Sequence, residues 1–228
     1  MFQICQDRAM EKKDGKRRDK ALSRDQVISA AIAILNESGE SGLTFRTLAQ
    51  RLATGPGAIY NHVQNKQDLL AAAADVMIQS ALSVNRDELA PGAAIRAVAL
   101  DVFDIIDAHP WVGMELSRAP WQPAMLLIFD RIGANLQALG VPDMAQFHAA
   151  STVTNFILGA AAQQAAAIRL HADGAQRATL LSAAARAAIH QDKKSSPFLQ
   201  RMAGNLTEHD DREQFSAGVD LILRGISG

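Results

Sequence analysis

Apolar residues recur at intervals of three and four along most of the chain, which is the spacing of one face of an α-helix. The pattern is clearest over residues 93–108, where Ile95, Val98, Ala99, Val102, Phe103 and Ile106 form an apolar face. The alternation of apolar and polar residues that is typical of half-buried strands is scarce. The pattern therefore predicts an all-α protein.

Proline and glycine residues divide the second part of the chain into separate helices, because proline cannot continue a helix and glycine often ends one. A connecting helix is expected over 66–85. It is followed by expected helices over 93–108, 111–116, 123–139, 143–171, 176–190 and 208–226. A polar loop is expected over 191–197.

The most informative stretch is 43–70, which is typical of two short helices joined by a tight turn and followed by a third helix. Thr44 is a suitable N-cap for the first helix. Residues 54–57, Thr-Gly-Pro-Gly, end that helix, because Pro56 lacks a backbone N–H and the glycines permit unusual dihedral angles. Asn65 is a suitable N-cap for the third helix.

The second short helix can pack on the first through Ile59 and Val63, which lie four residues apart. This leaves the side chains around Tyr60 and Asn61 free to point outward. Two packed helices with a tight turn between them, one of them slim and exposed, have the shape of a DNA-reading helix-turn-helix.

The stretch from about residue 22 to residue 70 resembles the DNA-binding domain of the TetR family of bacterial transcriptional repressors. The residues that carry the resemblance are Val27, Ile28, Ala30, Ala31, Leu35, Gly39, Gly42, Leu43, Thr44, Arg46, Leu48, Ala49, Leu52, Ile59, Tyr60, His62, Val63, Asn65 and Lys66. One position departs from it: the family usually has Gly at the head of the turn, where this chain has Ala53. A side chain there resists a positive φ, so either the turn begins later, at Gly55, or the recognition helix docks differently.

The resemblance implies that the second short helix enters the major groove of DNA. Asn61 can pair with adenine, and Arg46 can bind guanine or a phosphate group. By resemblance Tyr60, His62 and Lys66 contact phosphates, although Tyr60 and His62 could instead pack on the neighbouring helix. The candidate DNA-binding residues are Thr44, Arg46, Thr54, Pro56, Gly57, Ala58, Tyr60, Asn61, His62 and Lys66.

The distribution of charge supports an anionic partner at one end of the chain. The net charge is only −1, but residues 1–66 carry eleven Lys or Arg against seven Asp or Glu, and the remainder carries twelve against seventeen. Charge and the resemblance together divide the chain into three regions. A disordered basic leader is expected over 1–21 and a DNA-binding domain over 22–68, and the resemblance implies a helical effector-binding and dimerisation domain over 69–228. The leader either follows the DNA backbone or enters the minor groove, or it is merely a solvated tail.

The second half of the chain resembles the tetracycline-repressor branch of the family. The matching residues are Phe156-Ile157-Leu158-Gly159 and residues 215–225. The resemblance implies a homodimer in which the helices over 143–171 and 208–226 pair with their twofold mates. Such a dimer would bind a palindromic double-stranded DNA operator and leave it when a small-molecule effector binds. The alternative is that both helices are ordinary core of one chain.

In the branch's drug sensor, metal-binding and orienting groups stand where this chain has Glu115, Asn155 and Gln163. A magnesium–tetracycline chelate is therefore not expected, and neither a metal nor a cofactor is predicted. A mainly hydrophobic or aromatic effector fits the candidate lining better. The candidate effector-binding residues are Phe103, His109, Trp111, Met114, Glu115, Trp121, Phe129, Asn155, Phe156 and Gln163, although each could equally be core.

Other classes of protein are less consistent with the sequence. It contains no run of ~18 apolar residues that would predict a membrane span, and the lone Cys5 predicts no disulfide, which suits the cytoplasm. The acids near Asp210 and the serines Ser151 and Ser195 lack a base and an orienting group at useful spacing, so no enzyme is predicted. The runner-up is a helical small-molecule-binding or scaffold protein that no longer binds DNA, for which Ala53 is the best support.

Overall fold

The computed structural model describes residues 22–84, 86, 88–118, 121–170 and 210–227, with 179, 182, 183, 186, 197, 198, 201 and 202. Within these residues the regular structure is helical and contains no strand, which confirms the predicted all-α class. The helices are α1 (Arg24–Gly42), α2 (Phe45–Arg51), α3 (Pro56–Tyr60), α4 (Lys66–Ala81), α5 (Pro91–Ala108), α6 (Pro110–Arg118), α7 (Pro123–Ala138), α8 (Asp143–Leu170) and α11 (Asp211–Ser227).

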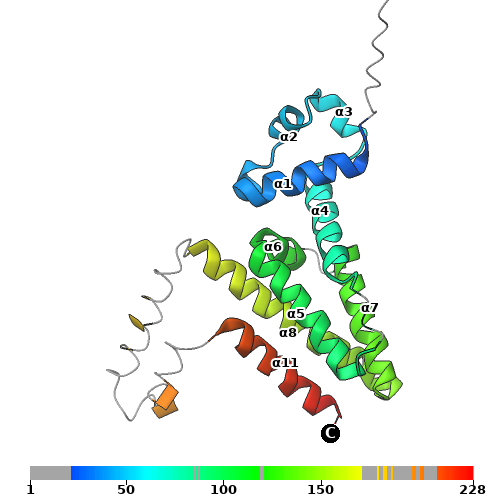
Figure 1. The fold of residues 1–228 in the computed structure, drawn as a ribbon, viewed down its shortest axis with the longest axis vertical. Helices are drawn as coiled ribbons and strands as arrows, with labels where there is room; N and C mark the ends of the chain where they lie inside the picture. Colours follow the sequence, from blue (N-terminus) through cyan, green and yellow to red (C-terminus); the bar gives the residue numbers. More distant parts are fainter. Residues whose placement is uncertain are drawn as a thin grey trace, which may run out of the picture.

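The described helices form a small head and a larger body (Figure 1). Helices α1, α2 and α3 make the head, and α5, α6, α7, α8 and α11 make the body. Helix α4 begins in the head, where it packs on α1, and ends in the body, where it packs on α5, α6 and α7. One helix is therefore part of both units.

Local hydrogen bonds fix where the helices of the head begin. Ser23 and Gln26 form a reciprocal capping box at the start of α1, and Thr44 forms one with Thr47 at the start of α2. The Asn65 side chain accepts a hydrogen bond from the backbone N–H of Asp68 at 2.9 Å. The predicted N-caps Thr44 and Asn65 are thus confirmed.

The helix boundaries differ from the predicted ones by a few residues. Helix α5 begins at Pro91, because the fixed φ of proline suits the first helical position. Helix α4 ends at Ala81 rather than at residue 85, and α11 begins at Asp211 rather than at 208. The predicted leader over 1–21 lies outside the described residues, and so does most of the predicted 176–190 helix and of the 191–197 loop.

Three stacked aromatic rings join α5, α8 and α11 in the body. The Phe215 ring lies between Phe103, at a centroid distance of 4.7 Å, and Phe156, at 5.4 Å. Gly218 permits this packing, because a Cβ atom at that position would overlap the Phe156 ring. Phe103 and Phe156, which were expected to line an effector site, here pack against Phe215 and the core of the body.

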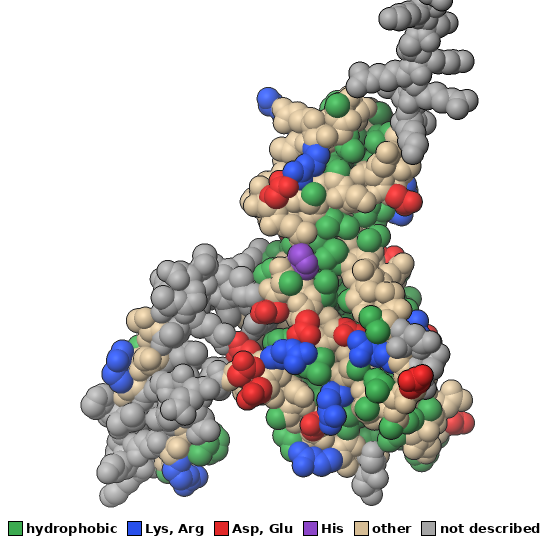
Figure 2. All heavy atoms as spheres, viewed as in Figure 1, with side chains coloured by type: hydrophobic (Ala, Val, Ile, Leu, Met, Phe, Trp, Pro, Cys, Tyr) green, Lys and Arg blue, Asp and Glu red, His purple; other side chains and the backbone are tan. Residues whose placement is uncertain are grey.

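Ion pairs add to the contact between α5 and α11. Arg212 binds Asp104 through both Nε and Nη2, at 2.7 and 2.9 Å, and Arg96 Nε donates to Asp220 at 2.6 Å. Figure 2 shows acidic and basic side chains interspersed on this part of the body. Exposed pairs of this kind contribute little each, about 0–1 kcal/mol, so the stacked rings dominate the attachment of α11.

In the described part of the chain, no helix combines the length and the apolar character needed to cross a membrane.

Candidate nucleic-acid interface and effector cavity

Helices α2 and α3 pack against each other at the far end of the head. Ile59 and Val63 are buried, as their spacing predicted, and Leu48 and Ala49 are buried on the α2 side. Gly55 is the N-cap of α3 and Pro56 occupies its first turn. The pair of helices with the turn between them has the form of a helix-turn-helix.

The turn between the two helices begins at Ala53. This residue has a φ of +50°, and no other non-glycine residue in the described part of the chain has a positive φ. Gly55 has an ordinary φ of −83°, so the alternative in which the turn begins at Gly55 is wrong. Ala53 takes the left-handed conformation that glycine usually supplies, at a cost of roughly 1–2 kcal/mol. The helix-turn-helix therefore forms although Ala53 stands where the family usually has Gly. This removes the main support for the alternative in which the protein no longer binds DNA.

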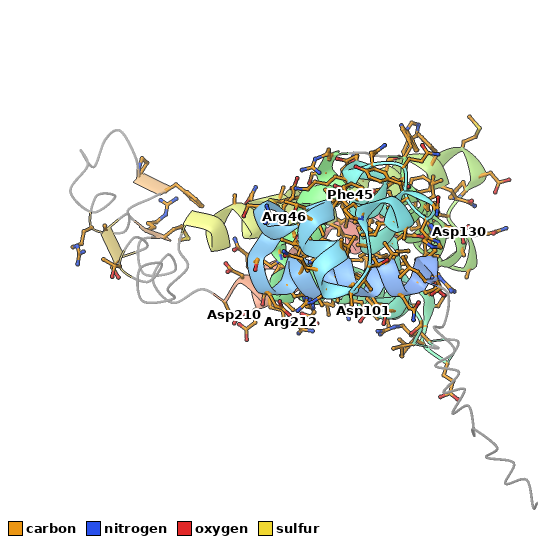
Figure 3. The ribbon with its side chains drawn as sticks, turned by 90° about the horizontal axis from the view of Figure 1, so that it is seen from above. Phe45, Arg46, Asp101, Asp130, Asp210 and Arg212 are labelled. Carbon is orange, nitrogen blue, oxygen red and sulfur yellow. The ribbon has the colours of Figure 1, made fainter. Side chains whose placement is uncertain are left out.

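Tyr60 packs on the neighbouring helix and still has exposed surface for a contact with DNA, the two alternatives expected from the sequence. Its ring stacks on Phe45 of α2, with a centroid distance of 4.4 Å and an interplanar angle of 9°. The residue is nevertheless 55% exposed, so the stack leaves much of it available to a partner. Figure 3 looks down on the head and shows Phe45 and Arg46 over its helices. Phe45 was not predicted from the sequence to be part of this site, although an aromatic residue next to Arg46 could have indicated it.

The remaining candidate DNA-binding residues lie around α3 and the ends of α2 and α4. Arg46, Gly57 and Asn61 are exposed, and His62 is half-buried. Lys66 donates a hydrogen bond from Nζ to the backbone oxygen of Glu40 at 2.7 Å, which leaves its other two N–H groups for a phosphate. Thr44 and Pro56 are exposed, and Thr54 and Ala58 are half-buried.

The folded head carries little net charge. Residues 22–66 contain four Lys or Arg and three Asp or Glu, so most of the basic excess lies in the leader, outside the described residues. Arg51 pairs with Glu37 at 2.5 Å, and Arg24 lies 4.0 Å from Asp68. Among the described residues Arg46 has no ion-pair partner, so it is the cation of the head most available to DNA.

The N-terminal end of helix α6 in the body is hydrogen-bonded to α1 in the head. The Asn36 side-chain oxygen on α1 lies 2.9 Å from Trp111 Nε1, which donates to it, and 2.8 Å from His109 Nδ1. Trp111 is buried, and burial lowers the pKa of His109. Both residues were expected to line an effector site, but their polar atoms face the head instead.

A second polar cluster connects the end of α6 to the head. The Glu115 carboxylate is 1% exposed and accepts hydrogen bonds from Gln67 Nε2 at 2.6 Å and from Arg118 Nη1 at 2.8 Å. Arg118 also donates from Nη2 to Glu40 of α1 at 2.9 Å. Burial raises the pKa of Glu115, and the contacts with Gln67 and Arg118 oppose that rise. Glu115 thus belongs to the contact between head and body.

A cavity of about 240 Å³ lies between α7 and α8. Its apolar and polar lining residues are Trp121, Met125, Leu126, Phe129, Phe147, Ser151, Thr154, Asn155 and Leu158. Thr154 is 6% exposed, and its hydroxyl has no hydrogen-bond partner among the described residues. The cavity therefore offers an apolar wall and an unused hydrogen-bonding group.

The structure brings only part of the predicted effector site together. Trp121, Phe129 and Asn155 line the α7–α8 cavity. Met114 packs partly buried against the core, and Gln163 is exposed on α8. The sequence reasoning missed Phe147, Ser151 and Thr154, although their spacing places them on one face of the long helix.

Comparison with known protein families gives two matches that together cover most of the chain. Residues 27–73 match the tetR family of bacterial regulatory proteins, and residues 93–228 match the tetracyclin repressor-like C-terminal domain.

Individual proteins agree with these matches. The chain is 30% identical over 216 residues to an HTH-type transcriptional regulator of Saccharopolyspora erythraea, covering 90% of this chain and 85% of that protein. It is 29% identical over 218 residues to the class D tetracycline repressor protein of Escherichia coli, covering 90% and 88%. The structure of a TetR transcriptional regulator from Streptomyces coelicolor is 43% identical in sequence, with a TM-score of 0.80. The match covers 90% of this chain and 98% of that one.

A less similar structure, that of BioQ with its double-stranded DNA operator, is 25% identical with a TM-score of 0.64. The match covers 91% of this chain and 99% of BioQ.

The conformation of Ala53 predicts that Ala53→Gly stabilises the protein. Glycine removes the left-handed strain of roughly 1–2 kcal/mol but gains about 0.4–1 kcal/mol of freedom in the unfolded chain, so a net gain of about 0.5–1 kcal/mol is expected. Thermal unfolding measures it, and Ala53→Ser, which keeps the Cβ atom, is the control. Equal unfolding temperatures for the glycine and serine variants would contradict the assigned strain.

The buried Glu115 predicts a pH-dependent effect of Glu115→Gln. The pKa of Glu115 is raised in the folded state, so the parent loses stability as pH rises from the ordinary carboxyl pKa through the raised value. The glutamine variant lacks this loss and should gain stability relative to the parent between mildly acidic and neutral pH. Urea unfolding at several pH values tests this. Glu115→Ala, which removes the acceptor of the Gln67 and Arg118 hydrogen bonds and leaves a void, should instead be less stable throughout.

Proposed function

Since this chain belongs to the TetR family of bacterial regulatory proteins, we propose that it is a cytoplasmic, homodimeric transcriptional repressor with a palindromic DNA operator. A small, mainly hydrophobic or aromatic effector would release it from that operator. The family consists of regulators rather than enzymes. The observation that carries the proposal is the helix-turn-helix at the end of the head, with Arg46, Tyr60 and Asn61 exposed around α3.

In the proposed complex α3 lies in the major groove. Asn61 pairs with a base, and Arg46 binds a guanine or a phosphate group. Tyr60, held against Phe45, presents its hydroxyl to the DNA backbone, and Lys66 and His62 add phosphate contacts. Because the folded head carries little net positive charge, we propose that geometry and hydrogen bonds contribute more to its specificity than long-range attraction does.

The proposed dimer forms through α8 and α11, which correspond to the predicted helices over 143–171 and 208–226. These two helices pack on each other in the body, and each keeps an exposed face. On α8 that face includes Gly159 and Ala162, whose small side chains permit close approach of another helix. On α11 it includes Leu221, which is 64% exposed. A twofold dimer that reads a palindrome in successive major grooves needs its two α3 helices about 34 Å apart, one turn of DNA.

The proposed effector site is the cavity between α7 and α8. Phe129 and Trp121 offer apolar surface, and the unused Thr154 hydroxyl and the Asn155 side chain offer hydrogen bonds. This combination suits a small aromatic or hydrophobic molecule with one or two polar groups.

Helix α6 is the proposed link between effector and head. It packs on α8, which forms one wall of the cavity, and both of its ends are bound to the head through Asn36, Gln67 and Glu40. A shift of α6 would therefore have to move the head or break these hydrogen bonds. Effector binding would favour a head spacing that no longer fits the operator, as a population shift between two geometries.

Selection of bound fragments from random double-stranded DNA at low salt tests the operator. A palindrome should be enriched. Tyr60→Ala should weaken binding to it about tenfold, because a hydrogen bond to a phosphate and the aromatic surface are lost. Tyr60→Phe, which keeps the stack on Phe45, should weaken it less. Gln79→Ala, on α4 far along the chain from α3, is the control.

Failure to enrich any palindrome at low salt would overturn the repressor proposal. If a palindrome is enriched but Tyr60→Ala binds it as tightly as the parent does, the placement of α3 in the groove is wrong.

The proposed dimer predicts that Leu221→Asp yields a monomer, because a carboxylate would be buried in the interface. Sedimentation measures the mass, and binding to the selected palindrome should fall with it. Val76→Asp introduces the same charge on α4 at a residue that is 42% exposed, and should stay dimeric. A dimeric Leu221→Asp variant would exclude this face of α11 from the interface.

A further inference from the structure

A second and larger cavity, of about 490 Å³, lies on the side of α7 that faces α4 and α5. Its wall combines apolar side chains with two arginines. The lining residues include Leu82, Leu89, Val98, Ala138, Arg86 and Arg131. None of the residues expected from the sequence to bind an effector is among them. The volume is sufficient for a small organic molecule.

The two arginines of this cavity differ in whether a described carboxylate neutralises their charge. Arg86 is ion-paired with Asp101 of α5, and that pair is largely shielded from solvent. Arg131 on α7 has no ion pair or side-chain hydrogen bond with another residue in the described structure. Asp130 precedes it on α7, but successive helical positions point about 100° apart, and Figure 3 shows Asp130 at the edge of the body. Arg131 therefore supplies to the cavity a guanidinium that no described residue neutralises.

The apolar part of the wall favours one kind of anion as the partner of the Arg131 guanidinium. Leu82 and Val98 are buried residues of the core, and Leu89 is 42% exposed. A small inorganic anion would leave this apolar surface in contact with water. An organic anion would cover it while its charged group binds Arg131.

We propose that this cavity is a binding site for an amphipathic organic anion, such as an aryl or alkyl carboxylate or sulfonate. Its charged group binds the Arg131 guanidinium, and its apolar part lies against Leu82, Leu89 and Val98. The site is separate from the α7–α8 cavity of the proposed function, and α7 lies between the two.

The position of the cavity gives such a ligand a route to the head. Leu82 and Ser83, which line it, directly follow α4, and α4 begins at Lys66 in the head. A ligand that fills the cavity contacts the end of the one helix that both units share. The site is thus suited to modulate the head independently of the α7–α8 cavity.

The probe pair 8-anilinonaphthalene-1-sulfonate and N-phenyl-1-naphthylamine tests this site, because the two molecules share an aromatic skeleton and only the first is an anion. Fluorescence titration of the full chain should give saturable binding of the sulfonate. Arg131→Gln should weaken sulfonate binding about tenfold and leave the neutral probe unchanged, because only the charge-assisted contact is lost. Arg131→Lys should retain most of the affinity.

Three further variants make the result specific to this cavity. Ala138→Trp fills it from its exposed side and should remove the charge-dependent part of the sulfonate binding. Arg46→Gln removes an unpaired cation from the head and should change neither. Trp121→Ala alters the α7–α8 cavity and should leave the charge-dependent binding intact.

Unchanged sulfonate binding in both Arg131→Gln and Ala138→Trp would overturn the proposal, as would loss of that binding in Trp121→Ala or absence of saturable binding to the parent. These measurements contain no DNA, so their failure leaves the operator selection, and the function proposed above, to be judged separately.

Discussion

The buried carboxylate of Glu115 is the constraint on which the joining of head and body depends. A charge that is 1% exposed is costly unless it is paired, and here Arg118 of α6 and Gln67 of α4 supply the partners. Arg118 then binds Glu40 of α1 with its other nitrogen. Three helices from the two units thus meet around one carboxylate. Because Glu115 and Arg118 both lie on α6, a movement of α6 relative to the head would break its hydrogen bonds with Gln67 and Glu40.

This arrangement gives the ligands proposed for the body a connection to the distant head. Helix α7 separates two cavities of different chemistry, one with aromatic walls against α8 and one towards α4 and α5 with Arg131, which pairs with no described residue. Helix α6 packs on α8, and α4 ends at the second cavity. The two cavities therefore lie next to different helices that contact the same head: α6 contacts α1, and α4 packs on α1.

The head itself shows how little is needed to present a DNA-reading helix. Buried Ile59 and Val63 hold α3, and Ala53 accepts a strained conformation in the turn because the packing of α2 and α3 requires it. Stacking on Phe45 restricts the Tyr60 ring before any DNA is bound, which lowers the entropy lost on binding. The scarcity of free charge on the folded head leaves the basic leader as the main source of electrostatic attraction that the sequence provides.

The sequence by itself determined the features that depend on neighbouring residues. Helical spacing, the N-caps Thr44 and Asn65, and the packing pair Ile59 and Val63 all follow from contacts within a few residues. Only the tertiary structure decided which way the long side chains of the body face. Phe103 and Phe156 meet Phe215 in the core, and Glu115 faces the head, because partners distant in the sequence compete for each side chain. A periodic pattern shows that a residue is buried, but not what it is buried against.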